Sequence, residues 1–331
     1  MRSRRSHRQS WSKALRFEPL PALLESSDAA ARFFTRRDLL DEAVESVSQL
    51  WRAADVARVL RRQMPSGGWR YPAPRAGLRS ADNYDQLETF RILSILVEKH
   101  GLDRSHPAIR RASRYVLAHQ SVAGDIRGIY GNQYSPNYTA AFLELLTKAG
   151  LGSDPAVRRS FRWILSVRQD DGGWAIPFRT AGRNFDPSTL RAATIQPVTG
   201  KPSSHLVTGV VLRALAANPQ YRTSPAARAA GVLLASRLFK ADVYADRRAT
   251  RFWTQFSYPF WFTDLVSALD SLSLAGFSRD EPSIQRALQW LVERQDKSGL
   301  WKLRMTRGGL DPGRHAWLTL AVCRVFKRLF P

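Results

Sequence analysis

Four proline-led segments of similar length constrain the fold of this 331-residue chain more than any other feature. They span residues 107–120, 155–169, 225–237 and 282–295, and each begins with proline. Proline at the first helical position presets φ and sacrifices no hydrogen bond, so each segment is predicted to begin a helix there. Asp154 and Ser224 directly precede two of the prolines and are predicted as N-caps. The segment from Pro155 has a single apolar stripe, which is typical of a surface helix.

A second kind of helix precedes the surface helices. Residues 138–149, 206–217 and 262–274 are apolar over most of a helical circumference, which predicts burial on more than one side. Short connections containing glycine join each buried helix to the next surface helix, and glycine suits a left-handed helix end. The repeating unit is therefore predicted to be a buried inner helix, a tight turn and an amphipathic outer helix.

The ends of the chain determine whether these units form an open array or a ring. Residues 51–63 resemble another outer helix, and residues 314–329 resemble a last inner helix without an outer partner after it. An open array leaves apolar faces unmatched at both ends. We therefore predict an all-α fold, an α/α toroid of five to six hairpins closed by the N-terminal helices. Residues 28–331 are predicted to form this single domain, and residues 1–27 a basic, disordered tail or a tether to anionic lipid.

The formal net charge is +23, and most of the basic residues are arginines. Arginine suits phosphate recognition, and a positive field favours diphosphates or anionic lipid surfaces as partners. Arginine-rich codon usage in a GC-rich genome is an equally good explanation. No nucleic-acid-binding module accompanies the charge, so nucleic acid is not an expected partner. The sequence has one cysteine and no apolar run of about 18 residues. It predicts a cytoplasmic protein, with the basic surface as a place for peripheral membrane contact.

Three loops after the outer helices share a pattern that runs from glutamine to tryptophan. Residues 63–69 read QMPSGGW, residues 169–174 read QDDGGW and residues 295–301 read QDKSGLW, with a degenerate copy from Gln120. This resembles the repeat of the prenyltransferase and squalene-oxidocyclase superfamily, whose members fold as α/α toroids. Single-domain bacterial members known mainly by these repeats are the most similar branch. The resemblance covers residues 40–330 and implies a structural role for the motif, without chemistry of its own.

The catalytic motifs of that superfamily are not matched. The DxDD motif of class II cyclases is absent, and the nearest fragments are 82–85 and 242–246. The DDxxD motif for Mg²⁺ is absent too. Around SYPFW, residues 257–261, the chain resembles zinc prenyltransferase β-subunits, but Gln255 and Ser257 replace two ligands and only His315 fits the third. One ligand of three does not hold catalytic zinc. We predict no metal and no cofactor.

In a toroid of this kind, the loops before the inner helices and the first helical turns line one mouth of the central cavity. Inner-helix N-termini favour anions such as diphosphate, and aromatic rings stabilise cations. The predicted catalytic candidates at these positions are Asp85, Asp264, His205 and His315. The predicted ligand-binding residues are Tyr84, Asn137, Tyr138, Lys201, Tyr258, Phe260, Trp261, Arg314 and Trp317. Packing, helix capping and ordinary hydrogen bonding are the alternative roles for all of them.

Two long connections are predicted to form the rim of this mouth. Residues 175–202 contain four prolines and three arginines, including Arg179, and are longer than a connection needs. A lid and a disordered insertion explain them equally well. Residues 240–259, with Asp242, form a second candidate rim.

These features support three functional hypotheses. The first is a toroid that binds or transforms an isoprenoid, either a prenyl diphosphate or a polycyclic terpenoid, in an aromatic cavity; as an enzyme it would be a noncanonical terpene cyclase or prenyltransferase. The second is a non-catalytic scaffold that binds a protein partner or an anionic membrane surface. The third is a carbohydrate-active (α/α)₆ enzyme, which needs two carboxylates about 5–10 Å apart in one cleft. Asp85 and Asp264 are the only pair we can nominate for it.

Overall fold

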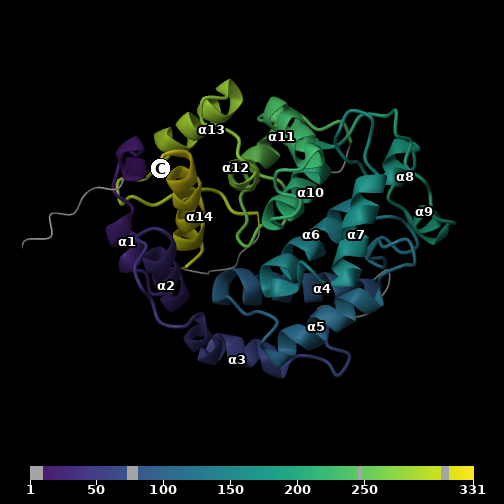
Figure 1. Ribbon diagram of the computed structural model, residues 1–331, viewed down its shortest axis with the longest axis horizontal. Helices are drawn as coiled ribbons and strands as arrows, with labels where there is room; N and C mark the ends of the chain where they lie inside the picture. Colours follow the sequence, from purple (N-terminus) through teal and green to yellow (C-terminus); the bar gives the residue numbers. More distant parts are fainter. Residues whose placement is uncertain (1–9, 73–80, 245–247, 307–312) are drawn as a thin grey trace, which may run out of the picture.

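The computed structural model describes residues 10–72, 81–244, 248–306 and 313–331. Within them, helices alternate between an outer and an inner layer around a ring (Figure 1). The inner helices are α2 (Ala29–Asp38), α4 (Ala81–Ser94), α6 (Pro136–Leu146), α10 (His205–Ala217), α12 (Leu265–Leu274) and α14 (Arg314–Leu329). The outer helices are α1 (Leu20–Leu24), α3 (Ala54–Arg61), α5 (Pro107–Ala118), α7 (Pro155–Ser166), α11 (Pro225–Arg237) and α13 (Pro282–Glu293). The predicted all-α toroid is confirmed, with six inner helices among the described residues.

Shorter helical segments occupy the connections. They are η1 (Ser10–Ala14), η2 (Val47–Arg52), η3 (Ile95–Lys99), η4 (Thr147–Leu151), α8 (Pro177–Thr180), α9 (Pro187–Arg191) and η6 (Thr250–Thr254). Where the chain is described, no helix combines the length and apolar character that a bilayer crossing requires.

The predicted helix starts agree with the structure. Prolines 107, 155, 225 and 282 open α5, α7, α11 and α13. The side chain of Asp154 accepts a hydrogen bond from the amide of Ala156, and that of Ser224 from the amide of Ala227. These bonds satisfy amide groups that a helix leaves unpaired at its first turn, so the sequence fixes where each outer helix begins.

Each Gln-to-Trp loop joins an outer helix to the inner helix that follows. The indole N–H donates to the carbonyl ten residues earlier on the outer helix, and the backbone N–H donates to a threonine hydroxyl of the next inner helix. The indole pairs are Trp69–Val59, Trp174–Ile164 and Trp301–Leu291, and the backbone pairs are Trp69–Thr89, Trp174–Thr208 and Trp301–Thr319. All three indoles are buried. The loops therefore fasten the two layers together, because a buried indole N–H needs an acceptor.

The glutamines link neighbouring hairpins, and the last of them closes the ring. Gln63 and Gln120 donate from Nε2 to the carbonyls of Ala108 and Ala156 at the start of the next outer helix. Gln295 makes the corresponding bond at 2.8 Å to the carbonyl of Phe17, and the Phe17 amide donates back to its side chain. The N-terminal segment therefore occupies the position of the next outer helix, as the ring prediction requires.

This closure moves the N-terminal boundary of the domain. We expected residues 1–27 to form a tail, but residues 10–24 form η1 and α1, which pack on α14. Trp11 and Leu23 are buried in the common core. The apolar face of the last inner helix is the physical reason, since without this cover it would be exposed to water. Residues 1–9 lie outside the described part of the chain.

Residues 257–262 run through the interior of the ring and divide it into two cavities. Tyr258 and Phe260 line one cavity, whereas Trp261 and Phe262 line the other. Arg213 of α10 holds this segment: its Nη1 donates to the carbonyl of Phe262, and its guanidinium lies 5.7 Å from the Phe260 ring centre. The two cavities can therefore be considered as separate sites.

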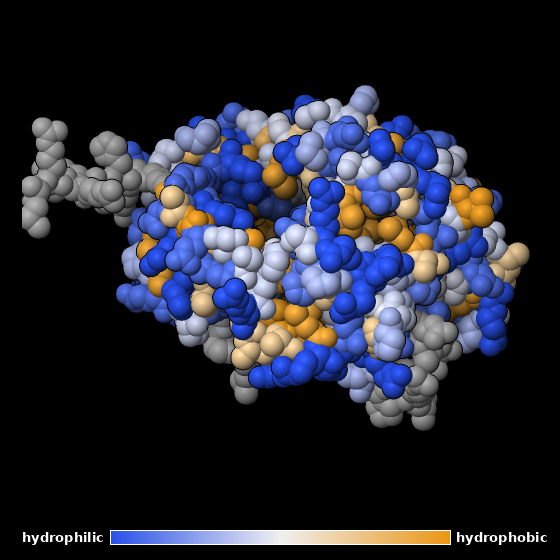
Figure 2. Space-filling model, turned by 60° about the horizontal axis from the view of Figure 1, so that its bottom comes forward, coloured by the Kyte–Doolittle hydropathy of each residue, from blue (hydrophilic) through white to orange (hydrophobic). Residues whose placement is uncertain are grey.

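The face of the molecule drawn in Figure 2 is mostly hydrophilic, with a few apolar patches. Arginines are exposed along the outer helices α5 and α7, at positions Arg110, Arg111, Arg114, Arg158, Arg159 and Arg162. They contribute to a positive field around the outer layer of helices.

Candidate ligand cavity

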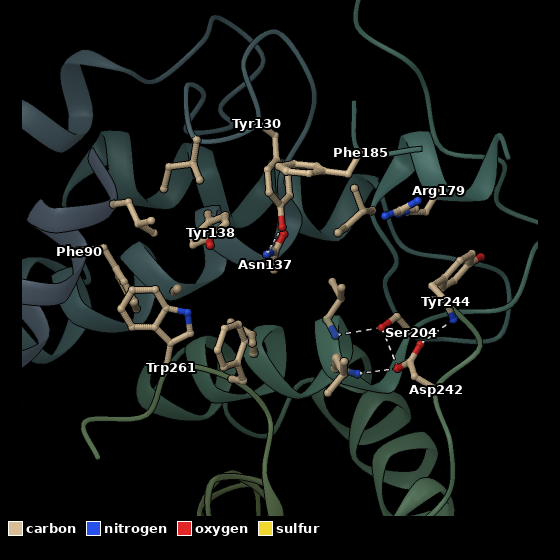
Figure 3. A pocket seen from close by; sticks show the side chains of 18 of the residues that line it. Phe90, Tyr130, Asn137, Tyr138, Arg179, Phe185, Ser204, Asp242, Tyr244 and Trp261 are labelled. Atoms are coloured by element: carbon tan, nitrogen blue, oxygen red, sulfur yellow. Dashed lines mark hydrogen bonds between the residues drawn. The ribbon is translucent and has the colours of Figure 1, made fainter. Parts of the chain in front are cut away.

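The first cavity lies where the N-terminal ends of α4, α6 and α10 meet. Its volume is about 350 Å³, within the range of about 300–1,000 Å³ that is usual for ligand pockets. Aromatic residues dominate the wall, and most appear in Figure 3: Tyr84, Phe90, Tyr130, Tyr138, Phe185, Tyr244, Trp261 and Phe262. Leu87, Ala141, Val207 and Val210 add aliphatic surface. The cavity is therefore suited to an apolar ligand.

The aromatic wall is held by edge-to-face contacts. Phe90 of α4 lies with its ring centre 5.3 Å from Trp261 and 5.6 Å from Phe142, at interplanar angles of 80° and 84°. Tyr130 contacts Tyr138 and Phe185 in the same way, both at 5.3 Å. Such pairs hold each ring in a defined orientation, so the wall is formed before any ligand binds.

Asp242 is the acidic residue among the described residues that line this cavity. It is buried and accepts hydrogen bonds from the Ser204 hydroxyl at 2.9 Å and from the amides of Leu206 and Tyr244 at 3.1 and 3.0 Å (Figure 3). Ser204 is the N-cap of α10 and Leu206 belongs to its first turn, so Asp242 also helps to cap that helix.

His205 lies beside Asp242 but does not line the cavity. Its Nδ1 is 3.3 Å from Asp242 Oδ2, and its ring stacks on Trp253 at 4.8 Å and 22°. Burial lowers the pKa of His205 despite the attraction of Asp242, because a buried imidazole is costly to charge. The neutral ring is thus expected to orient the carboxylate without adding positive charge.

Arg179 and Asn137 are the other prominent polar groups. Arg179 comes from α8 in the long insertion and is the basic residue among the described residues of the wall. Its Nη1 donates to the Arg183 carbonyl and to Asn184 Oδ1, both at 3.3 Å. Asn137 Nδ2 donates to the Tyr130 hydroxyl at 3.0 Å, and no described residue donates to the buried Asn137 Oδ1. One part of the cavity can therefore accommodate a polar or anionic head group, while the rest is apolar.

Comparison with known proteins shows partial similarity to squalene-hopene cyclases. Residues 82–180, which run from α4 to α8, match the family model of the squalene-hopene cyclase C-terminal domain. The chain is also 26% identical over 199 residues to the squalene–hopene cyclase of Bradyrhizobium diazoefficiens. Over these segments the chain is similar to terpenoid cyclases of the squalene-hopene type.

The similarities differ in how much of each protein they cover. The alignment to the Bradyrhizobium cyclase covers 52% of this chain and 26% of that protein, so the chain spans about a quarter of its curated relative. A solved structure of a protein from Actinoplanes is 18% identical, with a TM-score of 0.39, and covers 86% of this chain and 87% of its own. The reaction and the substrate of this chain are therefore inferred below from the residues that line its own cavity.

The structure brings four of the predicted ligand-binding residues together. Tyr84, Asn137, Tyr138 and Trp261 line the first cavity. All four lie at the start of an inner helix or directly before one, where the sequence predicts them. Their role in binding remains a prediction.

The other predicted site residues lie elsewhere. Tyr258 and Phe260 line the second cavity, and buried Trp317 stacks on Tyr258 at 5.3 Å. Lys201 is exposed on the insertion, and Arg314 and His315 form the half-buried first turn of α14. None of these three residues lines either cavity in the described part of the chain.

The two nominated carboxylates have structural contacts. Asp85 accepts a hydrogen bond from the Tyr71 amide at 2.7 Å, and Asp264 caps α12 through a reciprocal pair of bonds with Ser267. Neither carboxylate lines a cavity among the described residues, so they form no shared cleft there. This placement gives no support to the carbohydrate-active hypothesis.

Sequence reasoning did not select Tyr130, Phe185 and Tyr244. They come from three connections that bend back over the mouth. The insertion is fastened by Gln133, whose Nε2 donates to the carbonyls of Thr189, Ala192 and Ala193. The arginines and prolines of the insertion indicated a rim, but no local pattern indicated which of its residues face inward. The described residues also contain no cluster of three or more histidines, cysteines or carboxylates that could hold a metal ion.

Proposed function

We propose that this cyclase-like chain binds an isoprenoid in the first cavity, with the hydrocarbon against the aromatic wall. The single observation that carries the proposal is the composition of that wall: eight aromatic side chains and seven aliphatic ones surround one carboxylate and one guanidinium. Burial of apolar surface drives the binding of such a chain, at about 25 cal/mol per Å² removed from water. A cavity of about 350 Å³ suits a short prenyl chain better than a large polycycle.

The polar groups orient the ligand. Arg179 and the N-terminal end of α6 would attract a diphosphate, because a guanidinium and unpaired helix amides both favour anions. Phe90 and Trp261 lie in the apolar part, where the hydrocarbon would run. A prenyl diphosphate matches both parts and is the substrate class that we infer. A hydrocarbon without a head group would make no charge-assisted hydrogen bond with Arg179.

The same residues suit carbocation chemistry. The faces of Tyr138 and Trp261 can stabilise a positive charge on the chain. Asp242 is fixed in place by the amides of Leu206 and Tyr244 and is the acidic residue among the described residues of the wall. We therefore infer that Asp242 is the residue of this wall that pairs with the cation or exchanges a proton with the ligand.

Native mass spectrometry with lipid extraction tests the proposal, followed by titration with prenyl diphosphates of different chain lengths and with squalene. We expect a bound or added prenyl diphosphate, and Trp261→Ala should weaken its binding roughly tenfold or more, as for an aromatic hot spot. Trp290→Ala is the matched control, because Trp290 lies on the outer helix α13 against Phe256. Failure of every isoprenoid to bind, or equal effects of the two variants, would overturn the proposal.

A second candidate is a scaffold that binds a protein partner or an anionic membrane through its basic surface. The exposed arginines of α5 and α7 favour it. An empty cavity together with binding to anionic vesicles that weakens with salt would support this alternative over the first.

A further inference from the structure

The second cavity lies at the opposite end of the inner helices. It is formed by the C-terminal halves of α2, α12 and α14 and by the segments that follow α4 and α6, and its volume is about 410 Å³. Residues 257–262 separate it from the aromatic cavity, so a ligand here need not affect the isoprenoid site. Its wall is far more polar than that of the first cavity. Nothing in the proposed function requires this chemistry.

The charges in this wall balance. The basic members are Arg37, Lys148, Arg324 and Arg328, and the acidic members are Asp38, Glu98, Asp103 and Asp270. Arg324 contacts Asp38 at 2.5 Å, Arg37 contacts the same carboxylate at 2.6 Å, and Lys148 contacts Glu98 at 2.5 Å. Arg328 pairs with Asp270. Every basic group therefore already has a carboxylate partner.

A ligand with a net charge would disturb this balance. An anion would compete with the carboxylates, and a cation would compete with the arginines. Breaking a partly buried ion pair leaves one charge without compensation, which costs more than an exposed pair gains. The cavity should therefore discriminate against ions of either sign.

Some donor atoms of the basic residues and some acceptor atoms of the acidic residues nevertheless have no described hydrogen-bond partner. Arg328 uses Nε for Ser273 and Nη2 for Asp270, and its Nη1 donates to no described residue. Asp103 accepts two bonds from Ser105, both at Oδ1, and Glu98 receives Lys148 only at Oε1 among described partners. A ligand can thus both accept from guanidinium N–H groups and donate to carboxylate oxygens without displacing a pair.

We propose that the second cavity binds a small uncharged polyol, a molecule of the size of a sugar or cyclitol. A hydroxyl group is both a donor and an acceptor, so it can bridge an arginine and a carboxylate. Phe34, Val97 and Phe260 supply apolar wall for the C–H surface of such a ring. The site is independent of the isoprenoid proposal, because it shares no described lining residue with the first cavity.

The test compares three sugars that differ mainly in charge. Glucose, glucose 6-phosphate and glucosamine are titrated into the full-length protein and followed by calorimetry and by saturation-transfer NMR. We expect glucose to bind and each charged analogue to bind at least about tenfold more weakly, the usual effect of one uncompensated buried polar interaction. Absence of glucose binding up to roughly 10 mM, the weak end of specific affinities, would overturn the proposal, as would tighter binding of either charged analogue.

Two variants assign the binding to this cavity. Asp103→Asn removes one negative charge with little change in shape, so glucose should bind roughly tenfold more weakly while glucose 6-phosphate gains relative to glucose. Asp280→Asn is the matched control, since Asp280 is exposed in a connection outside both cavities. Equal behaviour of the two variants would refute the assignment. Leu274→Trp should fill the cavity and abolish glucose binding, and it decides the question if Asp103→Asn does not fold.

Discussion

Asp264 is a buried carboxylate whose replacement by asparagine should change how stability depends on pH. The side chain is 2% exposed and caps α12 by accepting the Ser267 amide at 2.8 Å, while its other oxygen accepts the Ser257 amide at 3.3 Å. Burial raises the pKa of Asp264 from 3.8 to about 6, and the two amides oppose this rise without cancelling it. Asparagine is an equally good N-cap and carries no charge.

The magnitude follows from the pKa difference between the folded and unfolded chain. A rise from 3.8 to about 6 is about two pH units, and at 1.36 kcal/mol for each it corresponds to about 3 kcal/mol. Because the pKa is raised in the folded state, the folded chain holds the proton more tightly. The stabilisation is complete below pH 3.8 and is lost as the pH rises through about 6.

The assay is urea denaturation followed by tryptophan fluorescence at several pH values from 4 to 8. As the pH rises from 4 to 8, the free energy of unfolding of the wild-type chain should fall by about 3 kcal/mol relative to that of Asp264→Asn. In the variant, the side-chain N–H of asparagine faces the Ser257 amide, which has then lost its acceptor. This lowers the free energy of unfolding by about 1–3 kcal/mol at every pH. Asp280→Asn, at an exposed position, should follow the wild-type curve. Parallel curves for the wild type and Asp264→Asn would refute the reasoning.

Three further predictions concern the ring and its core. Gly276 and Gly299 have φ of +81° and +82°, but a Cβ would meet nothing within 4 Å at Gly276 and a backbone oxygen at 2.3 Å at Gly299. Gly276→Ala should therefore cost about 1–2 kcal/mol of unfolding free energy and Gly299→Ala about 1–3 kcal/mol more; equal losses on thermal denaturation would contradict this. Gln295→Ala should speed hydrogen exchange in residues 10–24, whereas Gln63→Ala should leave that segment protected, and identical exchange would exclude a closing role for Gln295. Burial raises the pKa of the Cys323 thiol well above its ordinary value, so thiol reagents at pH 8 should modify Cys323 only after unfolding; rapid labelling of the native protein would disprove it.

The sequence predicts the hairpins well because their signals are local. Proline at a helix start, a cap residue before it and a glutamine-to-tryptophan turn after it act within about one helical turn. The structure adds contacts that no local pattern contains. Trp11 lies in a strongly basic stretch and is buried by α14, some 300 positions later in the chain. The basic composition therefore predicts a disordered tail, whereas residues 10–24 in fact cover the apolar face of α14.

The candidate site was only partly predictable for a similar reason. Helix starts can be placed from sequence, so Tyr138 and Trp261 were found at the mouth where they line the cavity. Phe185 and Tyr244 belong to connections, whose path depends on long-range hydrogen bonds such as those of Gln133. Tyr258 was expected at the same mouth, but residues 257–262 cross the interior and carry it to the second cavity.

The bond between Gln295 and Phe17 has a consequence for how such a chain can vary. An open array of repeats can gain or lose a unit at either end, because each repeat contacts only its neighbours. A ring joined through its first and last units has a fixed circumference. Removing or adding one hairpin would therefore separate the first and last units and break the contact between Gln295 and Phe17. Length changes are then tolerated mainly in the connections between helices. Those connections supply Arg179, Phe185 and Tyr244 to the cavity, so ligand preference can diverge while the number of hairpins stays constant.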